Sequence, residues 1–271
     1  VEKDGSLLFR GRVISEEIEF YGEKTLTCEG ELAFLLDSRV RPFAFTGGPA
    51  ELFAELLSQH NAVMENEPEK QFKVGTVTVT DPNDYINRSN TTYETTWDVL
   101  NTRLLDTLGG YLRVRHESDG VYLDYLAELD EMTTQPVEFG ENLLSYAKSL
   151  SADEIITALI PLGAKLTNEE GQQTDERLTI ADVNGGVDYV YDQETWDDGT
   201  KAGNLLVKAQ ARLLEFVKLT ASIDLSAVDL SQMDTSYDDF RLGQYVFVTS
   251  KPHGLEREKY LITKLSLKLL E

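Results

Sequence analysis

The sequence predicts an α+β fold that is rich in β-strands, and three observations carry that prediction. Residues 96–108 have the apolar spacing of an α-helix, and Gly109-Gly110 and a β-hairpin follow directly. Residues 219–230 and 261–269 alternate between apolar and polar side chains, as strands with one buried face do. The helix and hairpin predict a compact α+β unit, and the alternating strands predict a small barrel or sandwich.

The first segment is predicted to contain two strands and a short helix. Residues 7–20 and 25–30 have strand patterns, and residues 31–38 have a helical one. One side of the short helix carries Leu32, Leu35 and Leu36. Asp4-Gly5 comes directly before the first strand and has the composition of a hairpin turn. Because that turn leaves only two residues for its first strand, we expect the chain to be a fragment whose first strand partners lie upstream.

The middle segment combines two helices with strands. Pro49 begins a helix that we expect to end near His60-Asn61, and residues 74–80 are β-branched enough to predict a strand. The apolar stripe of this helix contains Leu52, Phe53, Leu56 and Leu57. Thr95 or Thr96 caps the second helix, and Gly109-Gly110 ends it. Its apolar face consists of Trp97, Leu100, Leu104, Leu105 and Leu108. A hairpin then pairs residues 111–115 with 121–125.

The last segment is predicted to hold several antiparallel strands and one helix. Residues 155–162 form a strand that tolerates Pro161 only near an end or at an edge. The tract 166–177 is almost wholly polar and predicts a solvent-exposed loop. Short strands are expected at 187–191, 219–230, 245–248 and 261–269, and a helix at 203–217. The expected apolar face of this helix consists of Leu206, Gln210, Leu213, Leu214 and Val217.

Composition limits the classes of function. The chain has 48 acidic and 25 basic residues, which gives a net charge of −23 at pH 7. A surface of this sign repels phosphate groups and argues against a conventional nucleic-acid-binding protein. Solubility is the simpler use of this charge. The sequence has no run of 18 apolar residues, so we expect no membrane insertion.

A search for catalytic, cofactor-binding and metal-ligating residues yields none. The sequence has no His-Glu-x-x-His motif, no phosphate loop and no Gly-x-Gly-x-x-Gly motif. His60 is expected to interact with a helix dipole, and His253 to lie on the surface. His116 is interpreted as a solvated turn residue beside Glu117 and Asp119, although these three could be imagined as metal ligands.

The single cysteine and the two tryptophans are also given structural interpretations. Cys28 cannot form an intramolecular disulfide, and a lone cysteine on a strand is more often a small buried apolar residue than a nucleophile. Trp97 and Trp196 could be platforms for sugar rings, but Trp97 lies on an apolar helix stripe and is expected in a core.

Three stretches carry a resemblance to a known family. The first is Phe9–Val13 followed by Thr27–Ser38. The second runs from Thr96–Asn101 through Leu108–Leu112, and the third joins Phe240–Val246 with Ser250–Leu255. Together they resemble the tail endopeptidase, or minor structural, proteins of phages and prophages of Gram-positive bacteria. The resemblance covers essentially the whole chain in the family's order, but no catalytic motif is present to receive the endopeptidase activity.

This resemblance implies barrel-like antiparallel domains that flank an α+β insertion, as in a baseplate hub, and assembly as a homotrimer. Two barrels in each of three chains would make a pseudo-hexameric ring on a sixfold tail tube. We expect residues 1–45 to be the C-terminal part of a first barrel-like domain and 46–148 an α+β middle domain. Residues 149–271 would form the second barrel-like domain with one packed helix.

We therefore expect the hub of a tail tip or baseplate, not an enzyme, with no cofactor. The trimeric ring would cap or extend the tail tube in a virion that is made in the bacterial cytoplasm. Its partners would be the distal tail protein, the tape measure, and receptor-binding or lysin parts. DNA would pass through without specific binding, along a lining that its acidic charge keeps repulsive. A tail-associated cell-wall endopeptidase or glycosidase is the alternative, and a carbohydrate-binding adaptor with exposed aromatics is a third hypothesis.

Overall fold

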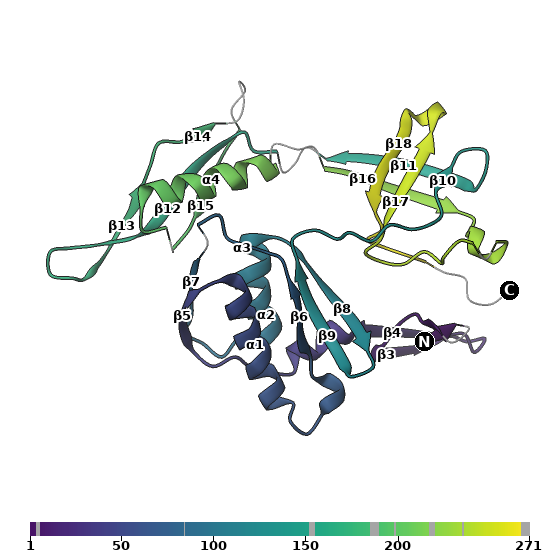
Figure 1. The fold of residues 1–271 in the computed structure, drawn as a ribbon, viewed down its shortest axis with the longest axis horizontal. Helices are drawn as coiled ribbons and strands as arrows, with labels where there is room; N and C mark the ends of the chain where they lie inside the picture. The colour runs from purple at the N-terminus through teal and green to yellow at the C-terminus, as the bar shows by residue number, and fades with distance from the viewer. Residues whose placement is uncertain are drawn as a thin grey trace. The chain divides into compact units, whose positions relative to one another are not determined.

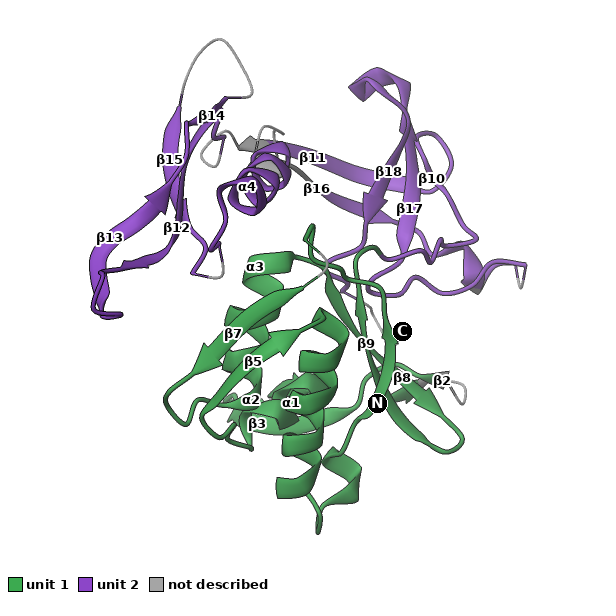
Figure 2. Cartoon of the chain, turned by 60° about the vertical axis from the view of Figure 1, so that its left-hand side comes forward, with its two compact units in different colours: residues 1–128 green, residues 129–271 purple. Residues whose placement is uncertain are grey.

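The chain divides at Glu128 and Leu129 into two units in the computed structural model (Figures 1 and 2). The structure describes residues 1–3, 6–83, 85–151, 155–184, 190–197, 199–216, 220–234 and 236–266. Both units combine helices with more numerous strands, which confirms the β-rich α+β class. The boundary falls inside the segment 46–148 that the sequence assigned to one domain, and the division into three domains stays a prediction.

Unit 1 combines a strand ribbon with a body of helices and sheets. Its elements in chain order are β1 (Glu2–Lys3), β2 (Ser6–Leu7), β3 (Gly11–Ile18), β4 (Lys24–Gly30), η1 (Glu31–Leu36), β5 (Phe43–Gly47), α1 (Pro49–Val63), η2 (Pro68–Lys70), β6 (Lys73–Val77), β7 (Ile86–Asn90), α2 (Thr96–Leu100), η3 (Asn101–Leu105), α3 (Asp106–Leu108), β8 (Tyr111–Glu117) and β9 (Gly120–Leu126). The described strands pair as β1–β2, β3–β4, β5–β7 and β6–β9–β8, with β6 parallel to β9. Strands β1 and β2 are antiparallel, as the expected hairpin requires, while its turn at residues 4–5 lies outside the described residues.

The predicted helix over residues 96–108 is confirmed as one continuous segment made of α2, the π turn η3, and α3. The Thr95 side chain accepts a hydrogen bond from the Asp98 backbone N–H at 3.0 Å, so Thr95 is the N-cap. Gly109 and Gly110 follow with φ values of 69° and 91°. A side chain at Gly110 would collide with the Leu126 carbonyl, so the helix stops where only glycine fits.

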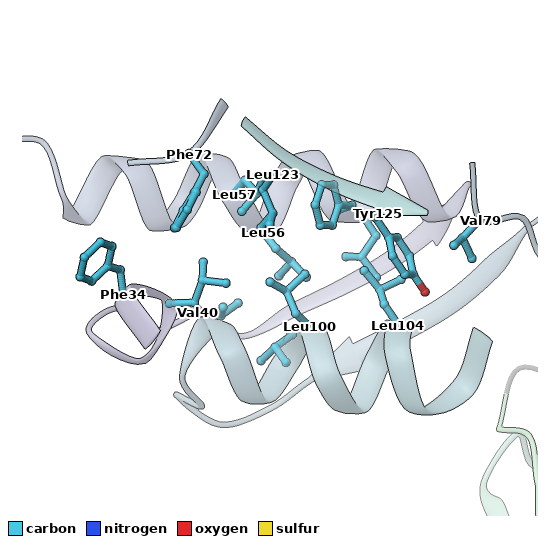
Figure 3. Close-up of a cluster of buried hydrophobic side chains, with 14 of the residues drawn as sticks. Phe34, Val40, Leu56, Leu57, Phe72, Val79, Leu100, Leu104, Leu123 and Tyr125 are labelled. Carbon is cyan, nitrogen blue, oxygen red and sulfur yellow. The ribbon is translucent and has the colours of Figure 1, made fainter. Parts of the chain in front are cut away.

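The core of unit 1 lies between α1 and the α2–η3–α3 segment (Figure 3). Four residues of the predicted α1 stripe are fully or almost fully buried, namely Leu52, Phe53, Leu56 and Leu57. Leu100 and Leu104 face them from the second helix, and Leu123 and Tyr125 complete the contact from β9. In η1 the prediction is partly wrong, because Phe34 and Leu35 are buried and Leu36 is exposed. The tighter pitch of a 3₁₀ helix moves the buried side by one residue.

Unit 2 is built from short sheets and one long helix. Its elements in chain order are β10 (Val137–Glu138), β11 (Leu143–Ser151), β12 (Ala158–Thr167), β13 (Gln173–Thr179), β14 (Val183–Asn184), β15 (Tyr191–Thr195), α4 (Ala202–Phe216), β16 (Thr220–Ala227), η4 (Leu230–Gln232), β17 (Tyr245–Ser250), η5 (Lys251–His253) and β18 (Leu255–Leu261). The described strands pair as β10–β17–β18, as β11–β16, and as β13, β14 and β15 around β12. Pairing is mostly antiparallel, but β10–β17 and β12–β15 are parallel.

The predicted apolar face of the second long helix is partly wrong. Among its predicted residues Leu213 is buried, and with Leu205 and Ala209 of α4 it packs in one cluster with Leu159 and Trp196. Leu206, Gln210 and Leu214 are exposed, and Val217 lies outside the described residues. The helix is apolar on two sides, and the small Ala209 between two leucines lets one side approach β12 closely (Figure 1).

Several predicted boundaries in unit 2 also change. The polar tract 166–177 is not a loop, because β12 and β13 form a hairpin there with a turn at residues 168–172. The strand expected at 155–162 begins at Ala158. The strand expected at 261–269 is wrong for residues 262–266, because β18 covers Leu255–Leu261 and shares only Leu261 with it. Residues 187–189 and 267–269 lie outside the described residues.

Pro161 lies inside β12, at a position where a described strand is paired on only one side. The register of β12 with β14 ends at Leu159, and that with β13 begins at Leu162. Ala158 N donates to Val190 O, and Leu162 O accepts from Trp196 N, so the even-numbered residues bond toward the β15 side. The missing N–H of Pro161 therefore faces the side on which no described strand is paired at that position.

Leu104→Ala should lower the free energy of unfolding by about 2–5 kcal/mol, because it leaves a hole between α1 and β9. Chemical denaturation at neutral pH measures this loss. Leu108→Ala is the matched control, since Leu108 is only partly buried on the same helix and its loss should be smaller. Equal losses in the two variants, or a loss at Leu104 below about 0.5 kcal/mol, would contradict the packing described here.

Candidate functional site

A buried serine–histidine pair was not anticipated from the sequence. Ser38 Oγ lies 2.7 Å from His60 Nδ1 and 2.6 Å from Thr96 Oγ1. His60 Nε2 lies 2.9 Å from the Lys70 carbonyl oxygen, which can only accept, so Nε2 carries the proton and Nδ1 accepts from Ser38. The distance suits a nucleophile and its base. All three side chains are buried, however, so the pair acts as a polar cross-link between α1, α2 and the segment that follows η1.

Burial sets the protonation of His60. Loss of solvent lowers the pKa of the imidazole, and the positive charge of Lys70 acts in the same direction. The hydrogen bond to the Lys70 carbonyl and the charge of Asp37 oppose this shift without reversing it. The ring lies beside that of Phe72, tilted by 33° with centroids 5.8 Å apart. His60 lies in the last turn of α1, where an interaction with the helix dipole was expected, and its neutral ring is held there by hydrogen bonds with Ser38 and the Lys70 carbonyl.

The other two histidines lie far apart in the chain. His116 is on β8, not in a solvated turn, and its Nε2 lies 2.7 Å from Oε2 of the buried Glu31. It has no common site with Asp119, which instead pairs with Lys73 at 2.6 Å. His253 is exposed, as predicted, and its Nδ1 lies 2.6 Å from Ser250 Oγ.

The described residues contain no group of three His, Cys, Asp or Glu side chains that could hold a metal ion. None of the helices in the described ranges is long and apolar enough to cross a membrane. Both tryptophans pack against cores: Trp196 is buried in unit 2 and Trp97 is partly buried in unit 1. The gap beside the π turn, between Phe53 and Leu104, has no room for a water molecule.

The β3–β4 ribbon has one apolar side. Its register pairs Val13 with Cys28, Glu16 with Leu26, and Ile18 with Lys24, with a bulge at Ile14. Paired residues point to the same side of a ribbon, so one face carries apolar side chains. We call this side the ribbon face, and it consists of Val13, Ile18, Leu26 and Cys28 with the Glu16–Lys24 ion pair. The opposite face consists of Arg12, Ser15, Glu17, Thr25, Thr27 and Glu29.

The ribbon face is solvent-exposed in this chain. Val13, Ile18 and Leu26 are 56%, 64% and 48% exposed. Cys28 is exposed as well, so the expectation that it is a buried apolar residue is wrong for the isolated chain. The sequence pattern around Cys28 predicted a strand with a covered side. Among the described residues, however, no third strand pairs with β3 or β4. A two-stranded ribbon with an open apolar side is only marginally stable in water.

The tip of the ribbon continues the apolar surface. Phe20 and Tyr21 are 96% and 91% exposed, with their rings 5.2 Å apart in an edge-on arrangement. Glu19 and Glu23 flank them, joined by a backbone hydrogen bond of 2.8 Å. Exposed aromatic and aliphatic side chains that adjoin one another are typical of interaction sites.

Ion pairs fix the base of the ribbon to unit 1. Arg12 Nη1 contacts both carboxylate oxygens of Asp37 at 2.7 Å, and Lys70 Nζ contacts the same group at 3.1 Å. Burial acts against ionisation of Asp37, but the hydrogen bonds from Arg12 and Lys70 outweigh it and lower the pKa. Arg10 reaches the buried Glu31 at 3.3 Å. The ribbon therefore extends from an anchored base (Figure 1).

Comparison with known proteins identifies the family of this chain. The family model described as prophage endopeptidase tail matches residues 131–266, half of the chain. The chain belongs to this family. It is a phage tail protein, as the resemblance implied. No curated protein sequence matches it.

Solved structures of tail proteins share the fold of this prophage tail protein. The tail protein from Neisseria meningitidis MC58 superposes with a TM-score of 0.61 at 15% identity, covering 95% of this chain and 74% of that one. The prophage MuSo2 43 kDa tail protein from Shewanella oneidensis gives 0.57 at 16% identity, covering 96% and 75%. Prophage tail protein gp18 from Listeria monocytogenes EGD-e gives 0.50 at 14%, covering 93% and 70%.

The neutral, buried His60 predicts a stability that depends on pH. In the folded protein its pKa is lowered, whereas the unfolded chain takes up a proton as pH falls below about 6.5. The free energy of unfolding should therefore decrease between pH 7.5 and 5.5, measured by urea denaturation. His60→Gln should flatten this dependence, and His253→Gln, at an exposed site, should preserve it. Parallel pH curves for His60→Gln and the parent would rule out this origin.

Proposed function

We propose that this prophage tail protein is a structural hub of the tail tip or baseplate. In the proposal, three copies form a ring that caps or extends the tail tube and connects to receptor-binding or cell-wall-penetrating parts. The observation that carries it is the exposed ribbon face, which leaves the isolated chain with an uncovered apolar sheet. Family membership and the shared fold of the three tail proteins support the structural role.

Burial of the ribbon face supplies a driving force for assembly. Covering apolar surface gains about 25 cal/mol per Å², so four side chains and two tip aromatics are a substantial surface for a ribbon of this size. Copies that contact one another head to tail close into rings when the rotation between them is a simple fraction of a turn. A ring of three chains with two related domains each would match the sixfold symmetry that the resemblance implies for the tube.

The charge of the chain fits a passage for DNA. Three copies would carry −69, three times the −23 of one chain. Part of that charge around a central opening would repel the duplex over about 8 Å at physiological salt and keep it from adhering. The same charge would oppose ring formation. Placement of the acids on the outside of the ring alone would leave solubility as their use.

The chain should therefore assemble to about 91 kDa, three times its mass of 30.4 kDa. Light scattering coupled to size exclusion at increasing concentration measures this. Salt between 0.05 and 0.5 M, on the order of the range over which screening becomes strong, should favour the trimer because apolar contacts persist while repulsion weakens. A mass of one chain at every concentration and salt level would contradict the ring.

The family's description as a prophage endopeptidase tail favours one other candidate, a cell-wall endopeptidase. The Ser38–His60 pair is the arrangement in the described residues that most resembles a nucleophile and base, and it is buried. Zymography on peptidoglycan separates the two proposals, with parent and Ser38→Ala run side by side. We expect no clearing from either. Clearing by the parent that Ser38→Ala abolishes would assign the pair a catalytic role.

A further inference from the structure

The outer face of β17–β18 carries cations on aromatic rings. Phe247 pairs with Lys259 and Tyr245 with Leu261, so these four side chains lie on one side of the hairpin. Lys259 Nζ lies 3.8 Å from the Tyr245 ring centre, and Arg257 Cζ lies 4.3 Å from that of Phe247. The opposite side of β17 carries Val246 and Val248, which are buried in the core of unit 2.

One of these cations lies on strained backbone. Arg257 has a φ of 80°, a left-handed value that residues other than glycine rarely adopt. It is the extra residue of a β-bulge, since the register passes from Val248–Glu258 directly to Thr249–Glu256. Bulges redirect side chains, and strained backbone tends to occur where function needs it. Here the bulge brings the guanidinium over Phe247.

The cations of this face are not neutralised within the described part of the chain. Their contacts are with aromatic rings, and no described carboxylate forms an ion pair with Arg257 or Lys259. Glu256 and Glu138 lie at the other end of the face, beside Thr249. On a chain with a net charge of −23, Arg257 and Lys259 place two positive charges together on one face.

The ribbon tip has the complementary chemistry. It presents Phe20 and Tyr21 between Glu19 and Glu23, and no ion pair in the described residues involves either glutamate. Aromatic rings and carboxylates are the groups that a cation–aromatic face accepts, by stacking and by charge. The two surfaces lie in different units, so one chain offers both halves of a head-to-tail contact.

We propose that the β3–β4 ribbon of one copy docks on the outer face of β17–β18 of a second copy. The ribbon face and tip aromatics pack against Tyr245 and Phe247, while Glu19 and Glu23 meet Arg257 and Lys259. This inference rests on the proposed ring and names the surfaces that build it. Apolar burial supplies most of the affinity, and the four charges select the partner surface and register.

Charge reversal tests the pairing. Glu19→Lys with Glu23→Lys raises the net charge by four, from −23 to −19, so general repulsion alone would strengthen assembly. The proposal predicts the opposite, an increase of about tenfold in the concentration needed for half-assembly at 0.15 M salt. Arg257→Glu with Lys259→Glu should weaken assembly similarly. The four changes combined in one chain should restore it, because both partner surfaces are then reversed.

Glu169→Lys with Glu170→Lys is the matched control, since it gives the same net charge from an exposed turn. This variant should assemble at least as well as the parent. Circular dichroism checks that each variant keeps the parent's fold, and the restored combination guards against a folding defect. A trimer that none of the charge variants weakens would overturn the docking proposal and leave the ring intact. Weakening by the ribbon variant without rescue would also overturn it, because the ribbon would then dock elsewhere. A parent chain that remains a monomer would overturn both.

Discussion

The exposed apolar side of the two-stranded β3–β4 ribbon is the main constraint on how this protein associates. Ion pairs from Arg10 and Arg12 to Glu31 and Asp37 fix the ribbon's base to unit 1. The pairing between β3 and β4 then places Val13, Ile18, Leu26 and Cys28 on one side. Unit 1 has a separate core between its helices. In the proposed docking, a second copy of the chain supplies the apolar contacts of the ribbon face.

Charge acts at two scales in such an assembly. Across the whole chain it is strongly negative, which opposes close association between copies and repels phosphate groups. Locally, Arg257 and Lys259 lie on aromatic rings and the ribbon tip carries Glu19 and Glu23. A predominantly repulsive surface with one attractive contact favours a single mode of association.

The sequence predicted well those elements whose signals are local. The helix at 96–108 has a cap at Thr95 and a double-glycine stop, and both work as expected. Elements that depend on tertiary cover were harder to predict. The residues around Cys28 have the pattern of a strand with a buried side, but Cys28 is exposed. Helix α4 is apolar on two sides, so periodicity could not predict that Leu205 is buried and Leu206 exposed. The ribbon face itself depends on the bulge at Ile14, which sets the register and has no sequence signal. The polar hairpin β12–β13 lacks the alternation that marks a half-buried strand.

Cys28 offers the most direct measurement of the central claim, because it is the only cysteine and lies on the ribbon face. The rate of its alkylation can be followed as the chain is concentrated from monomer to trimer, with fully denatured protein as the reference for a free thiol. If the ribbon face is covered by a second copy, the rate falls in step with the fraction assembled and returns on dilution. An unchanged rate in a chain that has become trimeric would show that the ribbon face stays open, and would contradict the account.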